Sequence, residues 1–446
     1  MNKMEWCRLL SAQRFGMEGW SSDRKHDRTE FQRDYDRLIF SAPFRRLQNK
    51  TQVFPLPGSI FVHNRLTHSL EVSCVGRSLG NNIAHGIKGQ YSKSEPWYKL
   101  FYECGNIVAA ACLAHDLGNP PFGHSGEKAI SSFFLEGKGM ELQSRMTAEE
   151  WNDLIHFEGN ANAFRLLTHQ FNGRRKGGFA LTYSTLASIV KYPYSSSLAG
   201  GKNKFGFFTT EADDFKKIAD DLGLIQKESM FLSYARHPLV YLVEAADDIC
   251  YQIMDIEDSH KLKILTTEET LSLLKGYFED DRLERINRSL SYIEDTNEQV
   301  SYLRASVIGL LVDECSRVFI EEEDTILRGE FQGPLIHKIS EKPREAYKEC
   351  TRIAYKKIYA SSDVLDIEVA GYQIIATLLE RLTDAVLNPH KAYSKLLLNR
   401  VPAQYEMNAP TTYGKILAVL DYISGMTDVY ALDLYRKING MSLPAL

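Results

Sequence analysis

The chain has 446 residues, of which 44% are hydrophobic and 25% charged, and its 53 basic and 58 acidic residues give a net charge of −5. This composition is ordinary for a folded globular protein, and the 11% of aromatic residues exclude disorder as its main state. The negative charge argues against a dedicated nucleic-acid-binding protein, although it leaves a local basic groove open.

The longest apolar runs, such as residues 107–114, are far shorter than the roughly 20 residues of a membrane-spanning helix. The N-terminal segment MNKMEWCRLL lacks the apolar stretch and cleavage site of a signal peptide. The seven cysteines form no CxxC pair, so neither a disulfide framework nor a cysteine-based zinc site is indicated. We expect a reduced, cytoplasmic protein with no membrane partner.

Hydrophobic residues recur at intervals of three to five residues along most of the chain, as they do in helices that bury one face. In chain order the pattern is strongest at residues 65–87, 100–117, 239–255 and 363–387. The alternation typical of a strand is best developed in KFGFFTT at residues 204–210. We therefore predict an all-α, mainly helical fold with at most a small β-hairpin near residues 200–210.

Clusters of Gly, Ser and Pro interrupt the helical pattern and predict loops. These clusters lie at residues 55–59, 137–139, 173–178 and 195–206. None of them is long enough to argue for a linker between separate domains, and the sequence contains no internal repeat. We therefore expect residues 1–446 to form a single helical body.

The most informative segment reads AHDLGNPPFGHSGE at residues 114–127. Apolar residues lead into His115 and Asp116 as a helix would, Gly118 fits the end of that helix, and the two prolines that follow prevent its continuation. An adjacent imidazole and carboxylate at the end of a buried helix can bind the same ion. An isolated His-Asp pair is, however, more often a surface histidine beside a helix-end aspartate.

Two further residues strengthen the case for a metal site. His68 lies on a helical face that continues through Val72 and Leu79, so its side chain is expected to point inward. A lone inward histidine is more often a satisfied core residue than a ligand. Asp247 shares a face with Val243, and a buried carboxylate needs a compensating partner. An arginine or a metal would both serve, so a salt bridge remains an open alternative.

In chain order these four residues form the pattern H…HD…D, which resembles the HD superfamily of metal-dependent phosphohydrolases. The surrounding sequence resembles one branch of it, the dGTPase-type deoxynucleoside triphosphate triphosphohydrolases, from about residue 24 to about residue 437. Residues 261–360 carry no motif of that branch. The motifs that carry the resemblance are DRL at 36–38, FRRL at 44–47, KTQV at 50–53, NRLTHS at 64–69, HDLGNPPFGHSGE at 115–127, FEGN at 157–160, KYP at 191–193, EAADDI at 244–249 and DYISGMTD at 421–428.

The resemblance implies that His68, His115, Asp116 and Asp247 bind one divalent cation. Two imidazoles and two carboxylates suit Mn²⁺, Mg²⁺, Fe²⁺ or Co²⁺ in an open octahedral site better than a closed structural zinc site. The resemblance also implies hydrolysis of a dNTP, with dGTP preferred, to the deoxynucleoside and tripolyphosphate by attack at the α-phosphorus.

The 5′-oxygen that leaves in such a reaction needs a proton, and His124 is the candidate general acid. Glu127, three residues further on, would hold the imidazole protonated and oriented. Both positions match the catalytic His–acid pair of the family. The alternative is that His124 caps a helix and that Glu127 is a solvated acid in its first turn.

Contacts with the substrate are also implied by the resemblance. No GxxxxGK[ST] loop occurs, so side chains must hold the triphosphate. The phosphate ligands would be Arg65, His156, Lys191, Tyr192 and Lys204. The sugar ligands would be Gln52, Tyr251 and Asp255, and Val53 and Glu368 would approach the base. Each basic residue taken alone is more often a solvated surface charge than a phosphate ligand, whereas Tyr251 is equally explained as a core aromatic residue.

The resemblance further implies an HD catalytic core at residues 30–260 and a C-terminal helical portion at 261–446 that completes the substrate pocket and the oligomer contacts. Members of the family commonly form homo-oligomers, often hexamers, and some respond to a dNTP or single-stranded DNA as effector. Two alternatives stay open. One is an HD phosphohydrolase of another nucleotide. The other is a nucleotide- or single-strand-DNA-binding regulatory protein with a residual site, favoured by the basic loop 173–177 and the arginines of residues 24–46.

Overall fold

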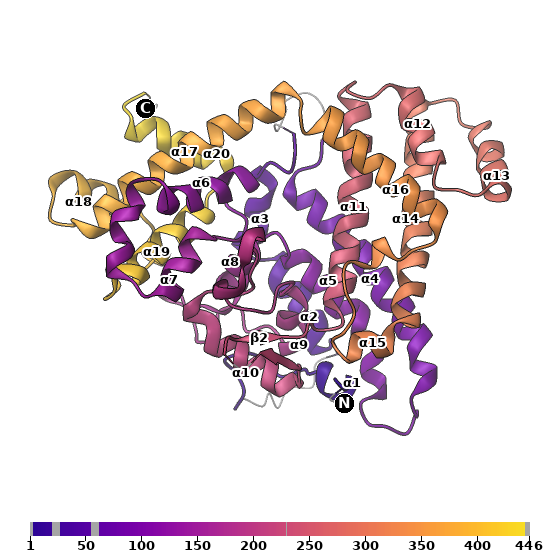
Figure 1. The fold of residues 1–446 in the computed structure, drawn as a ribbon, viewed down its shortest axis with the longest axis horizontal. Helices are drawn as coiled ribbons and strands as arrows, with labels where there is room; N and C mark the ends of the chain where they lie inside the picture. The colour runs from indigo at the N-terminus through magenta and orange to yellow at the C-terminus, as the bar shows by residue number, and fades with distance from the viewer. Residues whose placement is uncertain (1–2, 20–26, 55–61, 229, 442–446) are drawn as a thin grey trace.

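Helices make up most of the chain in the computed structural model, which describes residues 3–19, 27–54, 62–228 and 230–441 (Figure 1). Arg24 and the loop predicted at residues 55–59 lie outside these described residues. In the part of the chain that the structure describes, none of the helices combines the length and the apolar character that a bilayer crossing requires.

The N-terminal half of the fold is built around α5 (Cys104–Ala114), in which every residue except Asn106 is buried. Helices pack on it from several sides, which is why residues 107–114 form an uninterrupted apolar run. These helices are α2 (Glu30–Ile39), α4 (Arg65–Ile87), α9 (Tyr183–Ile189) and α11 (Val240–Lys261).

Helix α4 begins where the sequence supplies a strong capping residue. The Asn64 side chain accepts hydrogen bonds from the backbone N–H groups of Leu66 and Thr67, and the Thr67 side chain accepts in return from the Asn64 N–H. This start places His68 on the inward face in the first turn, where it is buried together with Val72. The helical segments predicted at residues 65–87, 100–117 and 239–255 are thereby confirmed as α4, α5 and α11.

A second group of helices packs beside α4 and α11 on the right of Figure 1. Its longest member is α14, which contacts both α4 and α11. The group consists of α12 (Thr267–Lys275), α13 (Asp280–Leu290), α14 (Thr296–Glu321), α15 (Glu323–Leu327) and α16 (Glu341–Ile353). A short π-helical segment, Ala354–Ile358, follows α16 and leads to the next long helix.

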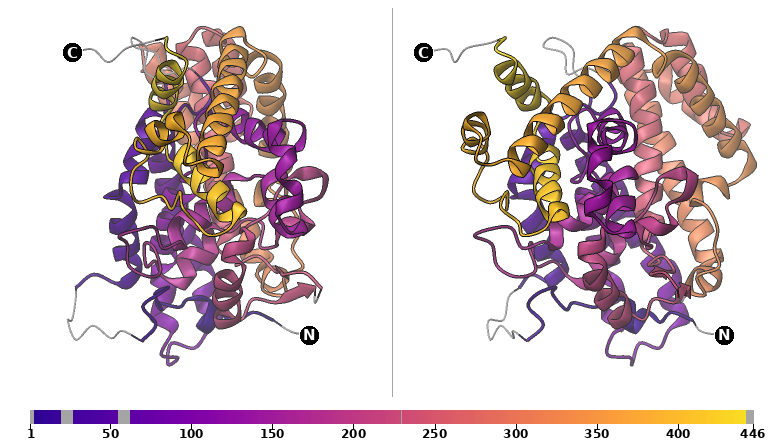
Figure 2. Two further views of the ribbon diagram at one scale, coloured as in Figure 1. Left: turned by 90° about the vertical axis from the view of Figure 1, so that its left-hand side faces the viewer. Right: turned by 60° about the vertical axis from the view of Figure 1, so that its left-hand side comes forward.

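The C-terminal helices enclose a second hydrophobic cluster on the opposite side of the molecule. The long helix α17 (Ser362–Leu387) contacts α18 (Ala392–Leu398), α19 (Thr412–Ser424) and α20 (Asp428–Ile438). It also packs along α6 (His124–Leu135), which in turn contacts α7 (Ala148–Ile155). Both views of Figure 2 show α17 passing beside α6, so C-terminal residues lie close to the segment that follows the HD pair.

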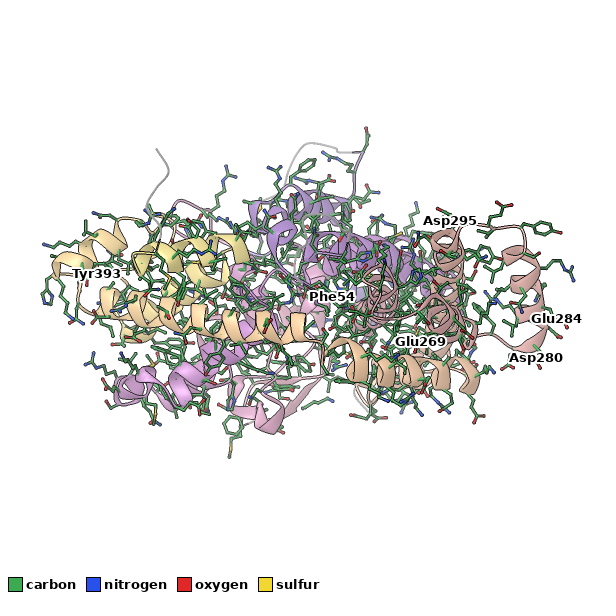
Figure 3. The ribbon with its side chains drawn as sticks, turned by 90° about the horizontal axis from the view of Figure 1, so that it is seen from above. Phe54, Glu269, Asp280, Glu284, Asp295 and Tyr393 are labelled. Atoms are coloured by element: carbon green, nitrogen blue, oxygen red, sulfur yellow. The ribbon has the colours of Figure 1, made fainter. Side chains whose placement is uncertain are left out.

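The remaining helices are short or peripheral. They are α1 (Trp6–Leu9), α3 (Ala42–Arg46), α8 (Gly159–Thr168) and α10 (Ala212–Leu222). Seen from above, α18 with Tyr393 and α13 with Asp280 lie at opposite ends of the molecule, whereas Phe54 lies near its middle (Figure 3).

The predicted all-α fold class is confirmed, but the predicted position of the hairpin is wrong. The two strands, β1 (Gln226–Glu228) and β2 (Ser233–Tyr234), pair antiparallel well after residues 200–210. Alternation in residues 204–210 was deceptive because Phe205, Phe207 and Phe208 are all buried, which removes the two-sided pattern of a surface strand. This segment forms one isolated bridge, from Phe207 to Ser195.

Candidate functional site

Three helices bring the four predicted metal ligands together. His68 comes from α4, His115 and Asp116 follow the last residue of α5, and Asp247 comes from α11. Ligand atoms of His68, His115 and Asp116 all lie within 4.8 Å of one another. Asp247 Oδ1 lies 3.1 Å from His68 Nε2 and 3.6 Å from His115 Nε2. Side chains that are up to 179 residues apart in sequence therefore share one centre.

The orientation of His115 suits metal binding. Its Nδ1 lies 2.6 Å from the Cys112 carbonyl oxygen and donates to it, which leaves the lone pair on Nε2. That Nε2 is buried and has no hydrogen-bond partner among the described residues. A buried acceptor without a partner is costly, and a cation would satisfy it. The two imidazoles and two carboxylates therefore fit a divalent metal of the Mn²⁺, Fe²⁺, Co²⁺ or Mg²⁺ type.

The electrostatics of the centre also favour a cation. Burial opposes ionisation of Asp116, but Arg65 and His115 hold the pKa of its carboxyl well below the usual range. Burial likewise opposes protonation of His115, yet the carboxylates of Asp116 and Asp247 raise its pKa. The two carboxylates thus favour a positive charge beside them. A divalent cation would supply that charge, with His115 as a neutral ligand, because only a neutral imidazole can bind a metal.

Gly118 proved to have a different role from the one predicted. Helix α5 ends at Ala114 with His115 as its C-cap, so Gly118 lies beyond the helix end. A Cβ at Gly118 would lie 2.1 Å from the Gly159 carbonyl oxygen. The glycine therefore permits a close backbone contact that holds the HDLGN segment against the start of α8.

His124 and Glu127 form a pair at the beginning of α6. His124 Nδ1 lies 2.8 Å from Glu127 Oε2, and Glu127 Oε1 accepts a hydrogen bond of 2.8 Å from the Gly159 N–H. The Glu127 side chain is only 12% exposed, so it is not a solvated first-turn acid, whereas the His124 side chain is 76% exposed toward the cavity. The hydrogen bond and charge of Glu127 raise the pKa of His124, which favours the imidazolium form.

Two adjoining cavities meet at the metal centre. The smaller, of about 300 Å³, is lined by His115, Asp116 and the His124–Glu127 pair. The larger, of about 1180 Å³, extends from His124 toward α16 and α17. The residues that line both are Gln52, Arg65, His124, Asp247 and Tyr251. The arrangement provides a compact polar end beside the ligands and a wide end large enough for a nucleoside.

The predicted phosphate ligands fall into two groups. Arg65, Lys191, Tyr192 and Lys204 line the smaller cavity, whereas His156 is not among the residues that line either cavity. The Nδ1 of His156 lies instead 2.7 Å from the Asn203 side-chain oxygen.

Each cation in the smaller cavity already has a carboxylate partner. Arg65 Nη1 lies 2.7 Å from Asp116 Oδ2, Lys191 Nζ 3.0 Å from Glu244 Oε1, and Lys204 Nζ 2.6 Å from Glu158 Oε1. Burial opposes the charged form of Lys191, but Glu244 raises its pKa, so it stays protonated at any physiological pH. Cations fixed in this way are preorganised for a polyanion.

The three predicted sugar ligands, Gln52, Tyr251 and Asp255, line one small space. The side-chain oxygen of Gln52 is buried without a hydrogen-bond partner among the described residues. Asp255 faces this small space, which Gln52, Tyr251 and Phe54 also line, and Phe54 lies near the middle of Figure 3. Burial raises the pKa of Asp255 to about 7, although its carboxylate accepts a hydrogen bond of 2.6 Å from the Tyr359 hydroxyl. Asp255 lines neither of the two cavities described above, but Tyr359, its hydrogen-bond partner, lines the larger one.

The predicted base contacts, Val53 and Glu368, both line the larger cavity, Glu368 from α17. Sequence reasoning assigned no role to Glu158 or Asn160, which line the smaller cavity. Glu158 is 1% exposed, and its carboxylate binds both Lys204 and the Asn160 side chain. The FEGN motif at 157–160 was the sequence signal that could have identified them. In the structure, a buried acid with a lysine partner is typical of a functional site.

Comparison with known proteins gives consistent matches. The HD domain model matches residues 65–191, and the phosphohydrolase-associated domain model matches residues 337–437. A deoxyguanosinetriphosphate triphosphohydrolase-like protein of Pseudomonas aeruginosa is 38% identical over 455 residues, covering 99% of this chain and 100% of its own. Its Synechocystis counterpart is also 38% identical, with the same coverage. A deoxyguanosinetriphosphate triphosphohydrolase of Yersinia pseudotuberculosis is 30% identical, covering 98% of this chain and 99% of its own.

Proposed function

The chain belongs to the deoxyguanosinetriphosphate triphosphohydrolase-like family of HD-domain phosphohydrolases, and from that premise we propose a specific reaction. The protein hydrolyses a dNTP, preferentially dGTP, to the deoxynucleoside and intact tripolyphosphate. The preference is proposed because the names of the relatives specify this nucleotide. Val53 and Glu368 are the side chains at the wide end that would contact its base.

The observation that carries the proposal is the position of the acid relative to the ligands. His124 lines the same small cavity as His115 and Asp116, and Glu127 fixes it through a hydrogen bond of 2.8 Å. A metal centre alone would serve many phosphohydrolases. A metal centre with a facing imidazolium can also protonate a departing alkoxide, which is what release of a 5′-hydroxyl requires.

A bound divalent cation would polarise the α-phosphate and orient a water, with His68, His115, Asp116 and Asp247 as its ligands. Side chains of the protein bind the triphosphate and supply the proton. Lys191 and Lys204 hold the charge of the triphosphate, and their carboxylate partners keep them in place. His124 Nε2 carries the proton that passes to the 5′-oxygen as the P–O bond breaks.

Selection of deoxyribose follows from the shape of the junction between the cavities. Tyr251 lines both cavities, and its ring lies 6.3 Å, centroid to centroid, from the ring of His68. A sugar that reaches from the metal centre into the larger cavity must pass this ring. A 2′-hydroxyl would then meet the aromatic face without a hydrogen-bond partner, which disfavours a ribonucleotide.

Product analysis in ¹⁸O-labelled water tests the proposal. Each of the four dNTPs and GTP is incubated with the protein and Mn²⁺ or Mg²⁺, and the products are separated. We expect deoxynucleoside and tripolyphosphate, with the label in the tripolyphosphate, fastest for dGTP. Orthophosphate or pyrophosphate would instead indicate another nucleotide hydrolase, and no turnover would indicate a binding protein.

Two variants accompany the assay. His124→Asn should lower kcat by about 10²–10⁴-fold while metal binding persists, because it removes the proton donor only. His85→Asn, at an exposed histidine near the end of α4, should leave kcat unchanged. Equal activity of the two variants would contradict the role of His124.

A further inference from the structure

The C-terminal segment contacts the active-site loops through one buried carboxylate. Asp428 is 7% exposed, and its two oxygens accept from two backbone N–H groups that belong to different loops. Oδ1 lies 3.0 Å from Phe122 N, and Oδ2 lies 2.7 Å from Thr51 N. Phe122 precedes His124 by two residues, and Thr51 immediately precedes Gln52. One side chain thus joins the segment of the candidate acid to the segment of a candidate sugar ligand.

The turn that Asp428 contacts has a strained backbone. Phe122 has a φ of +63°, which is rare for a bulky residue, and Gly123 follows with a φ of +56°. Such conformations persist only where surrounding groups hold them, and they concentrate at functional sites. The strain lies directly before His124, the first residue of α6. The direction in which His124 leaves the turn therefore depends on whatever holds Phe122.

Two C-terminal elements hold Phe122. Asp428, the first residue of α20, binds its N–H, and α17 presses on its side chain. A Cβ at Gly371 would lie 2.6 Å from Phe122 Cβ, so the two elements are in direct contact there. Figure 1 shows α17 and α20 together above α6. The backbone and the side chain of the strained residue are thus both held by C-terminal elements.

A buried lysine reinforces the connection. Lys50 Nζ donates to the Asn119 carbonyl oxygen at 2.6 Å and to the Ser424 carbonyl oxygen at 2.7 Å. Together with Asp428 it joins three segments that are remote in sequence: residues 50–52, 119–123 and 424–428. Asp428 is therefore more than an acid placed at a helix N-terminus, since such an acid needs neither burial nor partners in two other loops.

We propose that Asp428 is a positioning residue for the reaction: it holds the turn that presents His124 and the loop that presents Gln52 in one arrangement around the substrate. The assignment rests on the proposed function, in which these two residues touch the leaving oxygen and the sugar. It gives the phosphohydrolase-associated region a role in the chemistry beyond covering the pocket.

The test compares Asp428→Asn with a matched control on the same helix. The amide keeps one acceptor oxygen, but its NH₂ group must face the second backbone N–H, so one of the two contacts is lost. Asp433→Asn is the control, because Asp433 is 43% exposed and, among the described residues, its side chain binds only Lys437 on its own helix. Binding of Mn²⁺ is measured for each variant to show that the metal centre, and hence the fold, is intact.

Amide hydrogen exchange of the peptides that cover residues 50–54 and 119–126 reports the contacts without reference to activity. Asp428→Asn should exchange about tenfold or more faster in at least one of them, in keeping with the loss of a charge-assisted hydrogen bond. With dGTP, its kcat should fall about 10²-fold, since a displacement near 1 Å can have that effect. Its KM for dGTP should also rise, because the loop that presents Gln52 to the sugar has moved.

Each outcome decides the assignment. If the wild type releases tripolyphosphate but Asp428→Asn shows the same amide exchange and kinetics as Asp433→Asn, the assignment is overturned and the proposed function stands. Faster exchange with unchanged kcat and KM would also overturn it, since Asp428 would then be structural only. If the wild type released no tripolyphosphate, the proposed function would fail first and the assignment with it.

Discussion

Arg165 offers a direct test of how the N-terminal half of the fold and the C-terminal helices are joined. Its Nε and Nη2 lie 2.9 and 2.8 Å from the two carboxylate oxygens of Asp421, and its Nη1 lies 2.6 Å from Glu211 Oε1. The three side chains are 5%, 6% and 2% exposed. The arginine belongs to α8 and Asp421 to α19. Arg165→Met keeps most of the volume and leaves two buried carboxylates without their cation.

The expected loss follows from the burial of this network. Breaking a buried ion pair from one side costs about 3–5 kcal/mol, because an uncompensated charge remains. The buried carboxyls can avoid this only by taking up protons, at about 1.4 kcal/mol for each pH unit above their ordinary pKa. Burial already raises the pKa of Glu211 to about 7 despite Arg165. The penalty in the variant is therefore nearly absent below about pH 4 and grows as the pH rises.

Urea denaturation of the wild type and Arg165→Met at pH 8 and pH 5 measures the loss. We expect the free energy of unfolding to fall by about 3–5 kcal/mol at pH 8 and by about 1–2 kcal/mol at pH 5. The control is Arg352→Gln, which breaks an exposed pair with Glu349 (58% and 48% exposed) and should cost under about 0.5 kcal/mol. A loss that equals the control, or that does not depend on pH, would refute the reasoning.

Glu127→Gln removes the carboxylate that raises the pKa of His124, so the alkaline limb of the kcat profile should move to lower pH; a limb at the same pH would show that another group is the acid. Tyr251→Ala should raise kcat/KM for GTP relative to dGTP, because the aromatic face no longer excludes the 2′-hydroxyl; an unchanged ratio would remove Tyr251 from sugar selection. His237 is buried, and burial lowers its pKa to about 4. Its ordinary pKa is about 6.5, so between about pH 4 and pH 6.5 the unfolded chain binds a proton at His237 and the folded chain does not. The free energy of unfolding should therefore fall by up to ~3 kcal/mol as the pH decreases from about 6.5 to 4. In denaturation curves measured over this pH range, His237→Gln should show a smaller fall than the wild type, and an equal fall in both would contradict the role of His237.

Hydrophobic periodicity and motif order predicted the main helices and the residues of the candidate metal centre. The apolar run at 107–114 predicted a buried helix, and α5 is buried along almost its whole length. The inward face assigned to His68 is observed, with the residue 1% exposed. Helical phase alone shows only which side of a helix a side chain occupies. The order H…HD…D supplied the rest, because it predicted that residues from α4, α5 and α11 meet at one centre. Their role as metal ligands stays a prediction.

Other features depend on tertiary contacts that no local pattern reports. Residues 205–208 of the strand-like segment are all buried, so alternation did not mean a surface strand. Gly118 looked like a helix end, but its role is a close approach to Gly159, a residue 41 positions away. His156 directly precedes the FEGN motif, yet its side chain contacts Asn203 and lines neither cavity. The two loops that Asp428 joins are equally invisible before the chain is folded.

The measurement that tests the central claim most directly is the stoichiometry of Mn²⁺ binding, followed by electron paramagnetic resonance in the wild type, His115→Ala and Asp247→Ala. The account predicts one tightly bound Mn²⁺ per chain in the wild type, with proton release on binding, and loss of that site in both variants. Tight binding of Mn²⁺ that survives in either variant would contradict a centre built from His68, His115, Asp116 and Asp247.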